Sequence, residues 1–263
     1  MVASLTAEQY DAYWRDGYLA PLPAVAPDVA RSCLDAIAHF EATTGQVARL
    51  AIKRKGHLKL MALYRLIFAA PVLDAVESLI GPDILCWGSA LFIKDADDPG
   101  HIAWHQDSYY FEMGPDDVVS AWIALAPSIL ANGPVRVVPG SHLGPVRSHR
   151  TSPPGSANLI GSRDEVDGDV DLGATVPLLL DQGQMSLHHA NLMHGSAPNL
   201  SGTRRCGFVV RYVSPRATPK GWQTATLVRG ADRLGRFGAD PVPHRDLEPA
   251  IAAFVDGMPA GTS

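Results

Sequence analysis

The chain has 263 residues, of which 46% are hydrophobic and 19% charged, and its formal net charge is −5. This composition is typical of a globular protein and excludes a disordered one, and a weakly acidic chain has no overall attraction to nucleic acid or anionic membranes. No run of about 18 apolar residues is present, so no membrane span is expected, and the N-terminus has no signal-peptide pattern. We therefore expect a cytoplasmic protein.

The first third of the chain carries helical spacing. Thr6 is placed to cap a helix through Gln9, and Gly17 is placed to end it. Helical spacing predicts three further helices, over residues 26–40, 58–68 and 71–80.

After Gly81 the pattern changes to short apolar or alternating runs, separated by turn signals such as Asn132-Gly133-Pro134. The predicted strands cover residues 84–93, 118–126, 135–138, 175–180, 185–189 and 206–213. Such a series predicts an antiparallel sandwich, barrel or jelly roll. We expect one domain over 1–263, with a helical part at about 1–80, a strand-rich core at about 81–215 and a C-terminal extension at about 216–263. The polar stretch 148–173 is expected to be a long surface loop.

The cysteines are few and far apart. Cys33, Cys86 and Cys206 are odd in number, which predicts neither a disulfide framework nor a cysteine zinc site.

The ten histidines are the main candidates for chemistry. His105 and Asp107 form a His-x-Asp pair, and alternate residues of a strand share one face, so both can reach one metal ion. A distant third His would complete the 2-His-1-carboxylate triad of non-haem Fe(II) oxygenases. The alternative is a surface His beside a solvated Asp. A second pair, His244 and Asp246, has no strand around it and is interpreted as coincidental.

Five histidines are candidates for the third ligand: His142, His149, His188, His189 and His194. His194 is favoured because it closes a strand-like run just before the turn at Pro198-Asn199. The returning strand begins with Arg204-Arg205, and arginine offers the bidentate geometry that the distal carboxylate of a cosubstrate needs.

Alternation along the returning strand separates the two arginines. Arg205, Gly207, Val209 and Arg211 share one face, while the other face carries bulkier residues that predict core packing. Gly207 beside Arg205 is expected to leave room for a ligand. The alternative for Arg204 and Arg211 is a surface or structural role.

Several blocks of sequence together resemble the phytanoyl-CoA dioxygenase family. They are Trp104-His105-Gln106-Asp107 with residues 117–125, Asn132-Gly133 with residues 138–142, and His194-Gly195-Ser196 with Arg204-Arg205. The resemblance extends over roughly residues 5–245. The chain departs from the family at Gly183-Gln184 and at Pro134, positions that affect turns rather than proposed ligands.

The resemblance implies an Fe(II)- and 2-oxoglutarate-dependent dioxygenase that consumes O2. Its expected fold is mainly β with flanking α: a double-stranded β-helix (jelly roll, cupin-like) core with N-terminal helices packed on it. The residues it implies are the iron ligands His105, Asp107 and His194, the 2-oxoglutarate contacts Arg205 and Ser196, and the cosubstrate-pocket residues Lys94 and Trp122. Because family halogenases replace the carboxylate ligand with a small residue, the presence of Asp107 argues against halogenation.

The expected reaction is hydroxylation, or another oxidation, of an unactivated C–H bond in a small molecule of specialised metabolism. Tyr109, Tyr110 and Phe111 are predicted to line the substrate pocket, with aromatic core packing as the alternative. A second possibility is an acyl-CoA 2-hydroxylase of the phytanoyl-CoA type, in which Lys53-Arg54-Lys55 would bind phosphates. A metal-binding jelly roll of another kind, or an inactive binding module, is the third.

Overall fold

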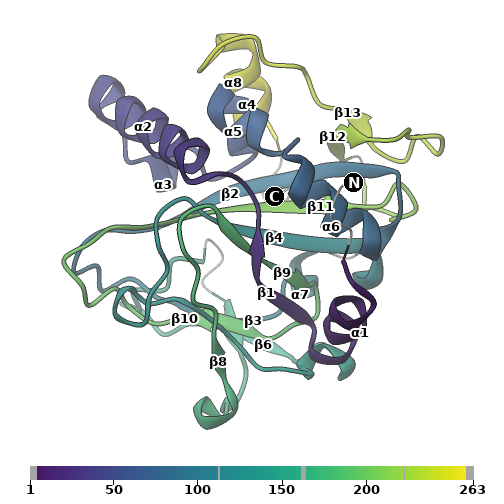
Figure 1. The fold of residues 1–263 in the computed structure, drawn as a ribbon. Helices are drawn as coiled ribbons and strands as arrows, with labels where there is room; N and C mark the ends of the chain where they lie inside the picture. Colours follow the sequence, from purple (N-terminus) through teal and green to yellow (C-terminus); the bar gives the residue numbers. More distant parts are fainter. Residues whose placement is uncertain (1–4, 112, 161–163, 222, 259–263) are drawn as a thin grey trace.

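The computed structural model describes residues 5–111, 113–160, 164–221 and 223–258. Its largest element is a sheet in the order β1-β9-β4-β11-β2-β12-β13 (Figure 1). Its strands are β1 (Tyr18–Pro23), β2 (Ile84–Lys94), β4 (Val118–Ala124), β9 (Gln184–His189), β11 (Arg205–Val213), β12 (Thr224–Arg229) and β13 (Gly238–Ala239). All neighbours are antiparallel except β12 and β13.

A smaller antiparallel sheet, in the order β3-β10-β5-β8, lies below the large one in Figure 1. Its strands are β3 (Ile102–His105), β10 (His194–Ser196), β5 (Val135–Val137) and β8 (Val176–Pro177). The two sheets share an apolar cluster that includes Trp122 and Val209 of the large sheet and Val135 and Val137 of the small one. This double sheet confirms the predicted jelly-roll core.

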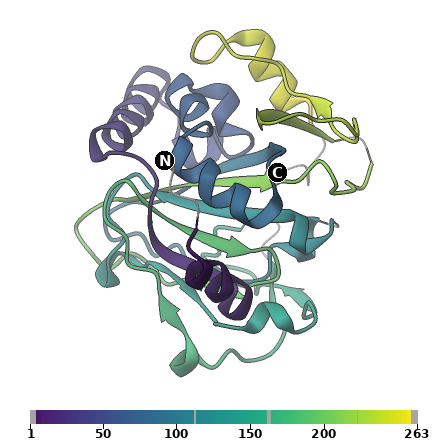
Figure 2. The same cartoon turned by 45° about the vertical axis from the view of Figure 1, so that its right-hand side comes forward.

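Most helices cover the other face of the large sheet (Figures 1 and 2). The α-helices are α1 (Ala7–Asp16), α2 (Pro27–Thr44), α3 (Ala48–Ala51), α4 (Gly56–Lys59), α5 (Met61–Leu66), α6 (Ala70–Ile80), α7 (Ser108–Phe111) and α8 (Pro249–Asp256). Short 3-10 turns are η1 (Pro115–Asp117), η2 (Leu130–Asn132), η3 (Ser141–Leu143) and η4 (Leu172–Ala174). The main hydrophobic core lies between these helices and the large sheet, with Ile37 of α2 and Phe208 of β11 among its members.

The helices predicted over 26–40 and 71–80 are present as α2 and α6, and α2 extends four residues further than predicted. Thr6 and Gln9 form a capping box at the start of α1, and Gly17 ends it with φ of +83°. The predicted helix over 58–68 is divided into α4 and α5, because Leu60 between them has an extended backbone.

The strands predicted over 84–93, 118–126, 135–138, 185–189 and 206–213 are present as β2, β4, β5, β9 and β11, whereas β3 and β10 were not predicted. β8 covers only two of the residues predicted as strand over 175–180. β1 was not predicted, because it contains Pro21 and Pro23; it lies at the edge of the sheet, where proline is tolerated. The predicted loop 148–173 contains a small hairpin of β6 (His149–Thr151) and β7 (Asp164–Val166).

Two further features concern the chain as a whole. No helix in the described ranges is long and apolar enough to cross a bilayer. Cys33, Cys86 and Cys206 are free thiols buried in the interior.

Candidate active site

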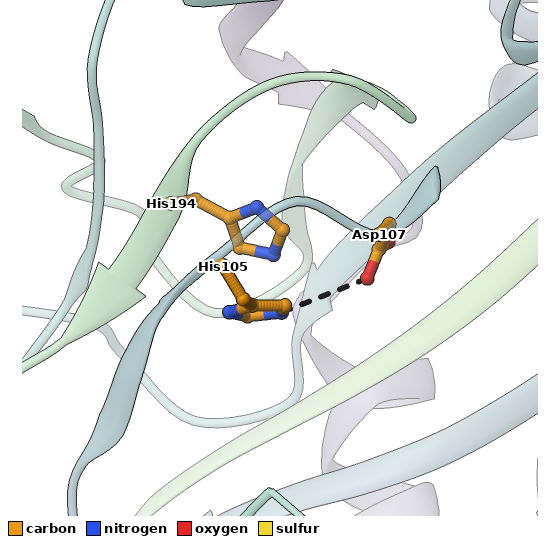
Figure 3. A group of neighbouring side chains, drawn as sticks. All are labelled: His105, Asp107 and His194. Atoms are coloured by element: carbon orange, nitrogen blue, oxygen red, sulfur yellow. Dashed lines mark ion pairs between the residues drawn. The ribbon is translucent and has the colours of Figure 1, made fainter. Parts of the chain in front are cut away.

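The three predicted metal ligands lie together between the two sheets (Figure 3). His105 ends β3, Asp107 follows two residues later, and His194 begins β10 directly opposite His105, so strand pairing brings the two rings to a centroid distance of 4.1 Å. One potential ligand atom from each of the three residues lies within 4.8 Å of the others. Among the residues that the structure describes, no other group of three His, Cys, Asp or Glu does this.

The two histidines are held in the tautomer that a metal requires. His105 Nδ1 lies 2.9 Å from the carbonyl oxygen of Ala103, and His194 Nδ1 lies 2.9 Å from that of Leu192. Since a carbonyl only accepts, each Nδ1 carries the hydrogen and each Nε2 keeps its lone pair. Burial and the neighbouring His105 lower the pKa of His194 to about 3, so its ring stays neutral.

Asp107 is oriented by a residue that the sequence analysis missed. Ser120 on β4 donates a hydrogen bond of 3.0 Å to Asp107 Oδ2, and Oδ1 lies 3.6 Å from His105 Nε2. Although burial disfavours the charge, the neighbouring His105 ring and the charge of Arg211 hold the Asp107 pKa well below its usual range. The cluster therefore presents two imidazole Nε2 atoms and one carboxylate.

Three predicted cosubstrate residues, Arg205, Ser196 and Trp122, line one side of the same cavity, and the fourth, Lys94, contacts Ser196 from β2. Arg205 at the start of β11 is buried, donates to the Gly133 carbonyl, and lies 5.5 Å from the centroid of Trp122. Lys94, opposite Arg205 on β2, donates to Ser196 Oγ over 2.7 Å. Burial and the neighbouring Arg205 lower the pKa of Lys94 to about 6. Arg205 Nε has no hydrogen-bond partner, so an anion placed here would satisfy it.

One expectation about this side is wrong. Gly207 was expected to leave room for a ligand, but the indole of Trp122 fills that room. A Cβ added to Gly207 would lie 2.0 Å from Trp122 Cζ2, so the glycine accommodates a side chain of the chain itself.

The inner face of β11 carries a second buried arginine, Arg211, at the opposite end of the strand from Arg205. Arg211 pairs with Ser120 of β4, and Ser120 pairs with His188 of β9, so three polar side chains line the cavity in one row. Alternation along β11 places Arg211 on the face of Arg205, as the structure confirms, but nothing in the sequence separated a ligand-binding role for Arg211 from a structural one.

The remaining candidate histidines lie away from the cluster or have other partners. His188 bonds Ser186 Oγ over 2.8 Å, and burial lowers its pKa to about 4. His142 and His189 pack ring against ring, with centroids 4.9 Å apart, and His149 stacks on Tyr109.

The three predicted pocket aromatics do not share one environment. Tyr109 is 41% exposed and stacks on His149, and the Tyr110 ring lies 6.2 Å from that of His105. Phe111 packs on Trp87 in a separate apolar cluster, with ring centroids 4.9 Å apart.

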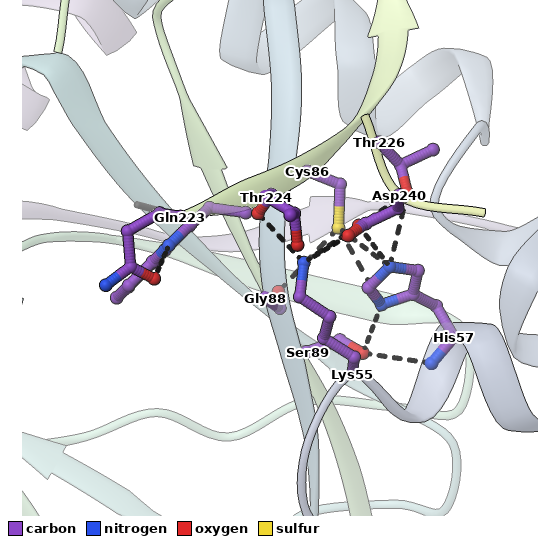
Figure 4. A network of polar contacts seen from close by, with 10 residues as sticks. Lys55, His57, Cys86, Gly88, Ser89, Gln223, Thr224, Thr226 and Asp240 are labelled. Carbon is purple, nitrogen blue, oxygen red and sulfur yellow. Dashed lines mark hydrogen bonds and ion pairs between the residues drawn. The ribbon is translucent and has the colours of Figure 1, made fainter. Parts of the chain in front are cut away.

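A second network of buried titratable groups lies outside the cavity (Figure 4). Lys55 Nζ lies 2.8 Å from both carboxylate oxygens of Asp240, and His57 Nε2 lies 3.8 Å from Asp240. His57 Nδ1 also bonds Ser89 Oγ on β2 over 2.7 Å. The Lys55 ammonium group has protein acceptors in Asp240 and the Thr224 carbonyl, so we interpret the network as structural.

The residues of the cavity fit the groups that the sequence resemblance implies. Two imidazoles and a carboxylate that leave positions open are the donor set of non-haem Fe(II) oxygenases. The unpaired Nε of Arg205, with Lys94 beside it, suits the far carboxylate of a dicarboxylic cosubstrate.

Comparison with known proteins agrees with this reading. The family model for phytanoyl-CoA dioxygenase (PhyH) matches residues 13–207. A probable alpha-ketoglutarate-dependent hypophosphite dioxygenase of Stutzerimonas stutzeri is 29% identical over 181 residues, which is 68% of this chain and 63% of that protein. The peroxisomal phytanoyl-CoA dioxygenase of Bos taurus is 31% identical over 53% of this chain and 42% of that protein. The match thus spans less than two thirds of either curated relative.

A solved structure is similar over nearly its whole length. The apo form of ThoJ, a non-heme monooxygenase, is 32% identical and covers 92% of this chain and 91% of its own, with a TM-score of 0.81. Since the family model covers well over half of the sequence, the chain belongs to the phytanoyl-CoA dioxygenase family.

Proposed function

We propose that this protein is an Fe(II)- and 2-oxoglutarate-dependent oxygenase that hydroxylates a C–H bond of a small molecule. In that reaction O2 and 2-oxoglutarate are consumed, one oxygen atom enters the substrate as C–OH, and the other appears in succinate, with release of CO2. The observation that carries the proposal is the convergence of His105, Asp107 and His194 with Arg205 in one cavity, where Lys94 pairs with Arg205 across the neighbouring strand.

Each residue has a defined part in this proposal. His105, Asp107 and His194 would hold iron, which supplies the oxygen-activating chemistry when bound. Arg205 would bind the distal carboxylate of 2-oxoglutarate, and Ser196 would donate to it, since Lys94 already donates to the Ser196 oxygen. Trp122 under the Arg205 guanidinium fixes its position and keeps water from it.

The alternative of an acyl-CoA substrate has less support from the structure. Of the cluster predicted to bind phosphates, Lys55 is buried against Asp240 and Arg54 donates to the carbonyl of Met258 over 2.9 Å. Two of the three cations are therefore engaged within the protein. We favour a small molecule that is not carried by CoA, in keeping with the prediction of a role in specialised metabolism.

The test uses the apoprotein and needs no substrate. Fe(II) and 2-oxoglutarate, added without oxygen, are expected to give a visible charge-transfer band. Asp107→Ala is expected to abolish the band by removing a ligand, and Arg205→Ala to raise the 2-oxoglutarate concentration needed for it by at least tenfold. Arg233→Ala, at a position that is largely exposed, is the control. A folded wild-type protein that gives no band would overturn the proposal.

A further inference from the structure

Arg211 is a buried cation whose donors are not used by the protein. Its exposed fraction is 8%, and neither Nε nor Nη1 has a hydrogen-bond partner. The Asp107 carboxylate interacts with it through charge alone, because Asp107 accepts its hydrogen bond from Ser120 and faces His105. Buried donors without partners are costly and rare in native proteins, so this arrangement indicates that an absent ligand completes it.

The neighbours of Arg211 hold it in place without consuming its donors. Its guanidinium carbon lies 5.2 Å from the centroid of Phe111, which supports the group through a cation–π contact. Ser120, on the adjacent strand β4, donates a hydrogen bond to Asp107. His188, on the next strand β9, is hydrogen-bonded to Ser186. The nearest members of the polar row are therefore already paired, and the Arg211 donors face the cavity that they share with the metal cluster.

Arg211 and Arg205 are too far apart for a single carboxylate group to bind both. They are six residues apart on one strand, so their Cα atoms are separated by about 20 Å at the rise of an antiparallel strand. Arg205 lies with Lys94 and Ser196, the residues proposed for 2-oxoglutarate. Arg211 lies on the other side of the cluster, close enough to Asp107 to lower its pKa. It is therefore available for a second ligand.

We infer that Arg211 binds a carboxylate of the substrate and so selects small organic acids. Nε and Nη1 belong to the two different hydrogen-bonding edges of the guanidinium, and either edge matches the two oxygens of a carboxylate. This salt bridge would hold the substrate by one end within reach of the metal cluster. The inference rests on the proposed function for the identity of the other occupant, 2-oxoglutarate.

The test measures binding rather than turnover. The protein is loaded with Zn(II), which supports no oxidation, and saturated with 2-oxoglutarate. Calorimetric titrations follow with straight-chain carboxylates from propanoate to octanoate, benzoate and cyclohexanecarboxylate, each paired with its primary amide. We expect at least one carboxylate to bind tenfold or more tightly than its amide. Arg211→Met is expected to abolish that preference and to leave 2-oxoglutarate affinity within twofold.

Two further variants make the result decisive. Arg211→Lys keeps the charge but not the paired donors of the guanidinium, and is expected to retain part of the preference for carboxylates. This partial retention would exclude misfolding as the cause of the loss in Arg211→Met. Arg205→Met is expected to do the reverse of Arg211→Met: it loses 2-oxoglutarate affinity and keeps the carboxylate preference when the cosubstrate is omitted. Absence of any preference in the wild type, or its persistence in Arg211→Met, would overturn the inference. A wild type that binds no 2-oxoglutarate would instead refute the proposed function.

Discussion

At the scale of single residues, the chemistry depends on hydrogen bonds that set the orientation of each candidate ligand. His105 and His194 each donate through Nδ1 to the carbonyl two residues earlier, so the sequence next to each histidine selects its tautomer. Asp107 depends instead on Ser120, which lies 13 positions along the chain and reaches it only in the folded protein. Such supporting residues tune metal affinity almost as strongly as the ligands themselves.

Ser120→Ala is therefore expected to weaken metal binding by about 10–100-fold, because the Asp107 carboxylate loses the donor that fixes it. Competition of the protein with a chromophoric chelator for Zn(II) measures the change. Ser186→Ala is the matched control: this serine is equally buried on the neighbouring strand but bonds His188. An equal loss in both variants would show that Ser120 has no specific role.

At the scale of elements, β11 joins the two halves of the structure through its alternation. Phe208 and Val210 pack under the helices, whereas Arg205, Val209 and Arg211 face the cavity. Alternation in the sequence predicted both the bulky face of β11, which packs under the helices, and the face that carries the arginines. It could not predict that a side chain fills the space over Gly207, because Trp122 comes from the neighbouring strand β4.

Gly207→Ala is expected to displace the Trp122 indole, lower the free energy of unfolding by about 1–3 kcal/mol through overpacking, and weaken 2-oxoglutarate binding. Urea unfolding and cosubstrate titration check the two effects. Gly202→Ala is the control, since a Cβ there meets no atom within 4 Å. If Gly207→Ala keeps wild-type stability and affinity, the contact with Trp122 does not matter.

At the scale of the whole molecule, the buried network of Lys55, His57 and Asp240 joins three distant parts of the chain. Asp240 follows β13 in the C-terminal extension, Lys55 precedes α4, and Ser89 lies on β2 (Figure 4). Burial opposes ionisation of Asp240, but the neighbouring His57 ring and the charge of Lys55 outweigh it and lower the pKa to about 2. The Asp240 carboxylate therefore binds a proton less tightly in the folded protein than in the unfolded chain.

Asp240→Asn is expected to reduce the free energy of unfolding by about 3–5 kcal/mol at pH 7, because it leaves the Lys55 charge buried without a partner. The Asp240 contribution is complete above the ordinary pKa of 3.8 and is lost as the pH falls toward 2. Denaturant unfolding between pH 7 and pH 2 should thus show that the difference in free energy of unfolding between Asp240→Asn and the wild type becomes smaller at low pH. The double variant Lys55→Met/Asp240→Leu should recover most of the loss. A constant difference across this range would contradict the assignment.

The sequence alone determined the elements whose signals are local. Capping residues set the ends of α1, apolar alternation marked the long strands, and the His-x-Asp motif with its distant His and Arg indicated a metal and a cosubstrate. The tertiary structure decided what depends on neighbours from other strands. Pairing of β3 with β10 brings His194 next to His105. Strand β4 supplies Ser120, which bonds Asp107, and Trp122, and Arg211 is a candidate ligand-binding residue only because it lines the cavity. The physical reason is that strand register and burial arise from contacts between residues far apart in the chain, which no local pattern records.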